Sequence, residues 1–128
     1  MILVTNNKSF LERKDYLKSN GFRLVLFEEK DYIEILEYSR NLIHKGYELL
    51  THPLYGSIKP NETIYRSIVL KENTVVDFNS VTLIEDAIST AIKFAKNKQR
   101  PIWTEKIKDD FRVIDMDLIS KTVDRIII

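Results

Sequence analysis

Short apolar runs and amphipathic stretches alternate along the first part of this chain. Residues 2–4 form a continuous apolar run, and residues 22–27 form a second one that is rich in aromatic and aliphatic side chains. Continuous runs of this length are typical of strands that are covered on both faces. Between them, Ser9 followed by Glu12 matches a capping box and predicts a helix over residues 10–19. The order strand, helix, strand predicts a parallel pair with a right-handed connection.

Helical spacing of apolar residues returns twice further along the chain. Asp31 starts a second capping-box pattern ahead of an amphipathic stretch that stops at Gly46. Residues 81–96 then carry an apolar stripe at helical spacing, and Thr82 with Glu85 is a candidate capping box for that helix. We therefore expect two long helices, each packed through one face.

The remaining apolar runs predict two more strands and leave the C-terminal part open. Residues 48–50 are a short third strand, and residues 65–71 are a fourth. No helix lies between these two strands, so the fourth is a candidate antiparallel strand. Residues 111–114 are compatible with an extended segment, whereas Asp115 or Asp117 would cap a last helix. Both readings of this part stay open.

These elements predict an α/β fold. We expect a single domain over residues 1–128. Its architecture would be a three-layer sandwich, in which helices flank a mostly parallel sheet of about four strands.

Composition narrows the class of protein. With 44% apolar and 30% charged residues, a chain of 128 residues has the make-up of a globular domain. The balance of 20 basic against 19 acidic residues provides no overall field for nucleic acid or an anionic membrane. No cysteine occurs, which removes disulfides and thiolate chemistry. No apolar window approaches the roughly 18 residues of a membrane span, and no signal segment precedes the first strand. We expect a cytoplasmic protein that binds neither nucleic acid nor membrane.

Polar residues follow three of the predicted strands. They are Thr5, Asn6 and Asn7 after the first strand, Glu28 and Glu29 after the second, and Thr51 and His52 after the third. Because the carboxyl ends of parallel strands share one edge of a sheet, we expect these side chains to surround a ligand site.

The run from Thr51 to Ser67 is the richest polar segment of the chain. It holds two of the three prolines, one of the two histidines and one of the three glycines, with hydroxyl, amide, lysine and arginine side chains. Such donors cradle carboxylate or phosphate groups, although the same composition also fits a solvated turn. The glycine spacing is not that of a phosphate-binding P-loop. The candidate ligand-binding residues are Asn6, Asn7, Ser57, Lys59, Asn61, Thr63 and Arg66.

His52 is the candidate catalytic residue of this run, because an imidazole with a pKa of about 6.5 exchanges protons near neutral pH. The alternative interpretation is that His52 fixes the loop through a hydrogen bond to a backbone carbonyl. His44 and His52 match no metal-ligand template and have no acidic cluster beside them, so we expect neither a metal nor a cofactor.

The stretch of residues 49–67 resembles the signature of the GrdX family. Residues 4–7, 103–106 and 114–119 are also similar to the ends of that family's sequences. The resemblance implies a small protein encoded beside components of glycine, sarcosine or betaine reductase in anaerobic, amino-acid-fermenting bacteria. It implies no reaction and no catalytic residues.

Three hypotheses about function follow. The first is an accessory protein that binds a small anionic metabolite or a reductase component through the loop from Thr51 to Arg66. The second is a small enzyme in which His52 is the acid or base and Lys59 and Arg66 hold an anionic substrate. The third is an interaction module that forms a homodimer or docks on a partner through the apolar run of residues 123–128.

Overall fold

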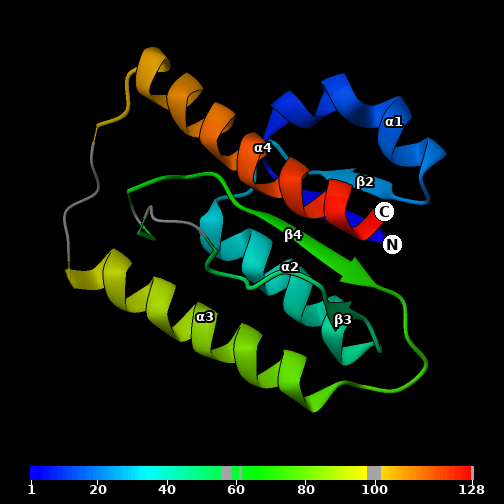
Figure 1. Ribbon diagram of the computed structural model, residues 1–128. Helices are drawn as coiled ribbons and strands as arrows, with labels where there is room; N and C mark the ends of the chain where they lie inside the picture. Colours follow the sequence, from blue (N-terminus) through cyan, green and yellow to red (C-terminus); the bar gives the residue numbers. More distant parts are fainter. Residues whose placement is uncertain (56–58, 61, 98–101, 128) are drawn as a thin grey trace.

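The computed structural model describes residues 1–55, 59–60, 62–97 and 102–127 (Figure 1). Four strands make one mixed sheet in the order β2-β1-β4-β3. Their bounds are Ile2–Thr5 for β1, Arg23–Leu26 for β2, Glu48–Leu49 for β3 and Ser67–Lys71 for β4. Among these strands only β1 and β2 pair in parallel, while β4 runs antiparallel to both β1 and β3. The expectation of a mostly parallel sheet is therefore wrong.

The antiparallel pairing has a simple cause. The described residues between β3 and β4 form no helix that could make the crossover that a parallel connection needs. Because β4 opposes both of its neighbours, β1, β2 and β3 still point in the same direction. Their carboxyl ends share one edge with the beginning of β4, where Thr5 lies opposite Ser67.

Helices α2 (Tyr32–His44) and α3 (Phe78–Asn97) cover one face of the sheet (Figure 1). Alternate residues of β1 and β4, Ile2 and Val4 with Ile68 and Leu70, form a core with apolar side chains of these two helices. The capping box predicted at the start of α2 is confirmed, since Asp31 accepts from the third amide of the helix.

Helix α3 begins earlier than the sequence pattern predicted. The Asp77 carboxylate accepts hydrogen bonds from the Ser80 amide at 3.0 Å and the Ser80 hydroxyl at 2.6 Å. Thr82, the predicted cap, lies inside the helix and donates to the Phe78 carbonyl at 3.1 Å. The earlier acidic residue satisfies the free amides first, so the prediction at Thr82 and Glu85 is wrong.

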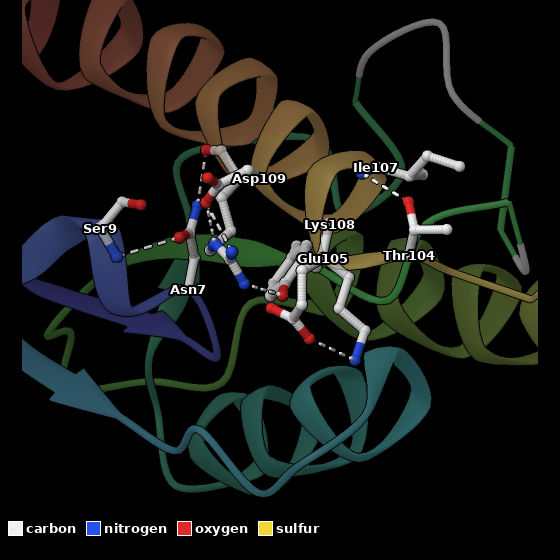
Figure 2. Close-up of polar contacts among 9 residues, drawn as sticks. Asn7, Ser9, Thr104, Glu105, Ile107, Lys108 and Asp109 are labelled. Carbon is white, nitrogen blue, oxygen red and sulfur yellow. Dashed lines mark hydrogen bonds and ion pairs between the residues drawn. The ribbon is translucent and has the colours of Figure 1, made fainter.

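The opposite face is covered by a 3-10 helix η1 (Lys8–Arg13), helix α1 (Lys14–Ser19) and helix α4 (Glu105–Ile127). The predicted helix over residues 10–19 is thus two short pieces. Its cap is Asn7, whose side chain accepts from the Ser9 amide at 3.1 Å, rather than Ser9 itself (Figure 2). Leu3 and Val69 from the sheet pack here with residues of all three helices. Helices on both faces make the three layers that the sequence predicted.

The C-terminal part is helical, so of the two interpretations given above the helical one is correct. It starts after Thr104, whose hydroxyl accepts from the Ile107 amide at 3.2 Å, and it continues without a break to Ile127 (Figure 2). Val123 is 0% exposed and lies in the same core as Leu3. Much of the apolar run proposed as a dimer surface is therefore packed inside the chain.

Candidate functional site

The end of β1 is tied to α4 through a fully buried side chain, Asn7. Its amide nitrogen donates to the Arg112 carbonyl at 2.9 Å and to the Asp115 carboxylate at 3.1 Å. Its amide oxygen accepts from Ser9, so every polar atom of the side chain is engaged. Asn7 consequently positions other residues instead of offering a free group to a ligand.

Asp115 is a buried carboxylate held by neutral donors. It accepts from the Tyr55 hydroxyl, from the Ser67 hydroxyl at 2.7 Å, and from Asn7. Ser67 also lies 2.7 Å from the Thr5 hydroxyl across the β1–β4 pair. This Asp115 network joins β1, the loop after β3, β4 and α4 at the shared edge of the sheet.

Tyr55 lies between Asp115 and Arg66. Burial raises the pKa of the Tyr55 phenol well above its ordinary value, and the neighbouring Asp115 charge raises it further. Arg66 acts in the opposite direction but does not outweigh these effects. The Tyr55 hydroxyl therefore stays protonated and remains a donor to the carboxylate.

Arg66 is 3% exposed and binds the residues that follow β3 from the interior of the protein. Its guanidinium lies between two aromatic rings, 4.1 Å from the centroid of Tyr55 and 4.6 Å from that of Tyr32. It also donates to the backbone carbonyls of Tyr55 at 3.0 Å and Pro53 at 3.4 Å. The cation–π contacts and carbonyls offset part of the cost of burying the charge, while Nε has no hydrogen-bond partner among the described residues.

Asn6 and Thr63 also use their polar atoms on the backbone. The Asn6 amide donates to the carbonyls of Lys30 at 2.9 Å and Ile64 at 2.6 Å and accepts from Arg66. The Thr63 hydroxyl accepts from the Tyr65 amide at 3.1 Å. These bonds connect the exits of β1 and β2 to the residues that precede β4.

The other predicted site residues are placed apart from this network. His52 is exposed, and its Nδ1 accepts from the Leu54 amide at 3.0 Å. The structural interpretation expected a backbone carbonyl as the partner, whereas the observed partner is a backbone N–H. Lys59 is exposed, while Ser57 and Asn61 lie outside the described residues. Neither His52 nor Lys59 lines the groove that lies at the exits of β1 and β2.

An open groove of about 500 Å³ lies at the shared edge of the sheet, between the start of α2 and the first turns of α4. Asn6 and Lys8 line it from the exit of β1, and residues 28–31 line it from the exit of β2. Ile64 and Tyr65 form the side that precedes β4. The predicted convergence of the β1 and β2 exits is thus present, whereas the third exit at His52 does not reach the groove.

The α4 side of the groove was not predicted. It consists of Trp103, Glu105, Lys108 and Arg112. Lys108 and Glu105 lie one turn apart and form an ion pair at 3.6 Å (Figure 2). The sequence signal for this side is the spacing of the charged residues 105, 108 and 112, which places them on one face of a helix.

The groove lining carries charges of both signs. The basic residues are Lys8, Lys30, Lys108 and Arg112, and the acidic residues are Glu28, Glu29, Asp31 and Glu105. Among the four cations, Arg112 is the buried one, and the hydrogen bonds that it donates to the Asp109 carboxylate are the main reason that the pKa of its guanidinium is raised. The arrangement brings donors and acceptors of both signs together around one groove.

Within the described residues, no group of three or more histidine, cysteine, aspartate or glutamate side chains is placed to hold a metal ion. None of the helices in that part combines the length and apolar character required to cross a bilayer.

The family of GrdX-like proteins matches residues 2–124. This chain belongs to the GrdX-like family. The match spans both the Asp115 network and the groove, so the geometry described above belongs to the GrdX-like part of the chain. No curated protein and no solved structure matches the chain.

Proposed function

We propose that this GrdX-like protein is an accessory protein of the glycine, sarcosine or betaine reductase system, and that it binds a small ligand with an anionic group in the groove between α2 and α4. The family resemblance supports the association with the reductase. The groove volume of about 500 Å³ supports the ligand, since pockets for small molecules usually enclose about 300–1,000 Å³.

The convergence of basic side chains on the groove is the observation that carries this proposal. Lys8 comes from the exit of β1, Lys30 from the exit of β2, and Lys108 and Arg112 from α4. Four cations from three separate parts of the chain meet around one polar hollow at a sheet edge, where loops supported by rigid strands commonly bind ligands. Because acidic residues lie in the same lining, the ligand is a small polar molecule whose anionic group is directed toward the basic residues.

In this proposal, described residues of the loop from Thr51 to Arg66 form one side of the groove and hold that side in position. Ile64 and Tyr65 contact the ligand directly, because they line the groove. Asn6, Asn7, Thr63 and Arg66 keep that wall in place, because their polar atoms bond to the protein itself.

Isothermal titration calorimetry tests the proposal with glycine, betaine, acetyl phosphate and purified reductase subunits as titrants. Lys108→Gln removes one groove cation and should weaken the observed binding by about three- to tenfold, as expected for one partly screened charge. Lys106→Gln is the matched control, since Lys106 is exposed on the same helix and outside the groove lining. It should change the affinity by less than about twofold. An absence of heat with every titrant would remove the proposal.

A further inference from the structure

Arg112 differs from the other cations of the groove in being held rigidly. It is 7% exposed, and its Nη1 donates to the Tyr65 hydroxyl at 2.6 Å. Its Nε and Nη2 donate to one oxygen of Asp109 at 3.2 and 2.5 Å. The backbone is fixed as well, because the Arg112 carbonyl accepts from Asn7. A guanidinium positioned in this way loses little freedom when it binds a further group.

The guanidinium retains donors for such a group. Arginine has five N–H donors. Asp109 takes the Nε donor and one on Nη2, and Tyr65 takes one on Nη1. Among the described residues, one donor on each of Nη1 and Nη2 is left without an acceptor. Two donors on neighbouring nitrogens match the paired oxygens of a carboxylate or phosphate.

Asp109 places a negative charge on the same guanidinium. Its side chain is 74% exposed, and the pair is formed within one turn of α4 (Figure 2). An exposed carboxylate gains little from such a pair, so the fold does not depend on it. Its charge nevertheless repels any anion that approaches Arg112 from the groove.

We infer that Arg112 anchors the carboxylate or phosphate group of the ligand through Nη1 and Nη2, and that Asp109 sets the affinity as a competing charge on that guanidinium. The inference rests on the proposed function, and it identifies the residue and the kind of group that are recognised.

Replacing Asp109 tests the competing charge. Asp109→Asn keeps an oxygen that accepts from Arg112 but removes the negative charge. Acetate and inorganic phosphate serve as separate probes, in NMR titrations of the arginine Nε–H signals at constant ionic strength. We expect each anion that binds to bind about three- to tenfold more tightly to the variant than to the wild-type protein. A gain for phosphate alone assigns a phosphate group, and a gain for acetate assigns a carboxylate.

Asp110→Asn is the matched control, because Asp110 is the next residue along the helix, is exposed and lies outside the groove lining. It makes the same change in net charge and should alter the affinity by less than about twofold. Equal effects of the two substitutions, or no response of the Arg112 signal to either anion in any variant, would overturn the inference.

Arg112→Lys tests the anchor itself. A lysine keeps the charge but lacks the two-nitrogen fork, so the affinity should fall at least about tenfold, in parallel with an unfolding measurement that shows the variant is folded. If it does not fold, the Asp109 and Asp110 pair decides the question, since both variants retain Arg112. A metabolite or reductase subunit that binds wild type and a folded Arg112→Lys equally well rejects the anchor and leaves the proposed function standing.

Discussion

Tyr55 connects two buried groups of opposite charge that do not touch each other. The face of its ring lies against the Arg66 guanidinium, and its hydroxyl donates to Asp115. One side chain thereby provides a cation–π contact and a hydrogen bond to an anion. Each buried charge thereby has a partner, and Tyr55 is held in place between them.

The raised pKa of Tyr55 predicts a loss of stability at alkaline pH. The unfolded chain releases the phenolic proton near the ordinary pKa of 10.0, while the folded protein retains it. Above that pH the unfolded state binds fewer protons than the folded state, so the free energy of unfolding falls as the pH rises. Below it the contribution is fully present. Tyr32, whose pKa is raised mainly by burial, acts in the same direction.

Tyr55→Phe should therefore show a shallower decline of stability above pH 10 than the wild-type protein. Below that pH the variant should be less stable by about 1–2 kcal/mol, because Asp115 loses one donor. Urea unfolding between pH 8 and about pH 11 measures both effects. Identical alkaline slopes in the two proteins would contradict this account of Tyr55.

At the scale of elements, substitutions at Asp77 and Thr82 distinguish the observed start of α3 from the predicted start. Asp77→Ala should reduce the free energy of unfolding by about 1 kcal/mol, because the Ser80 amide loses its acceptor. Thr82→Ala should change it by less than about 0.5 kcal/mol, since Thr82 lies within the helix and is exposed. Chemical denaturation of the two variants makes the comparison. A larger effect at Thr82 would place the start of the helix where the sequence pattern did.

The elements themselves show what sequence patterns report. The apolar run of β1 was correctly interpreted as a strand buried on both faces, whereas β2, which was interpreted in the same way, has one exposed and three half-buried residues. Burial on both faces, however, carries no information about strand direction. The lack of a predicted helix before residues 65–71 indicated an antiparallel fourth strand, and the pairing of β4 with β1 and β3 confirms it, although the sheet as a whole was expected to be mostly parallel. The capping box of α2 was found because Asp31 and Glu34 match the pattern directly. At α3 the capping residue Asp77 is followed three residues later by Ser80 rather than by Glu or Gln, so the capping-box pattern does not reveal it.

The candidate site was predictable only in part for a related reason. Asn6 and Glu28 were correctly expected to share an edge, because that follows from the directions of β1 and β2. Arg112 and Asp115 lie in the segment whose structure the sequence left open. Their proximity to Tyr65 and Ser67 depends on packing between residues about 50 positions apart, which no local spacing reveals.

At the scale of the whole molecule, α4 combines two tasks in one helix. Its first turns form a side of the groove, and its last turns cover the sheet through Val123 and its neighbours. Truncation after Thr122 should therefore lower stability by several kcal/mol, because the buried Val123 and the partly buried Ile126 and Ile127 leave the core. Thermal unfolding and sedimentation of the truncated chain measure this. A truncated chain that stays equally stable and changes only its oligomeric state would favour the dimer hypothesis for this run.

The position of β4 between β1 and β3 also affects how the chain assembles. Thr5 and Ser67 are neighbours across the sheet although they are 62 positions apart in the chain. During synthesis, the first strand, helix and second strand emerge well before β4, and one edge of β1 then has no partner. Pairing over such a distance is slow compared with local helix formation. The nascent protein consequently passes through a stage in which one edge of β1 is unpaired and accessible to strands of other chains. This stage ends only after β4 has been synthesised to Lys71.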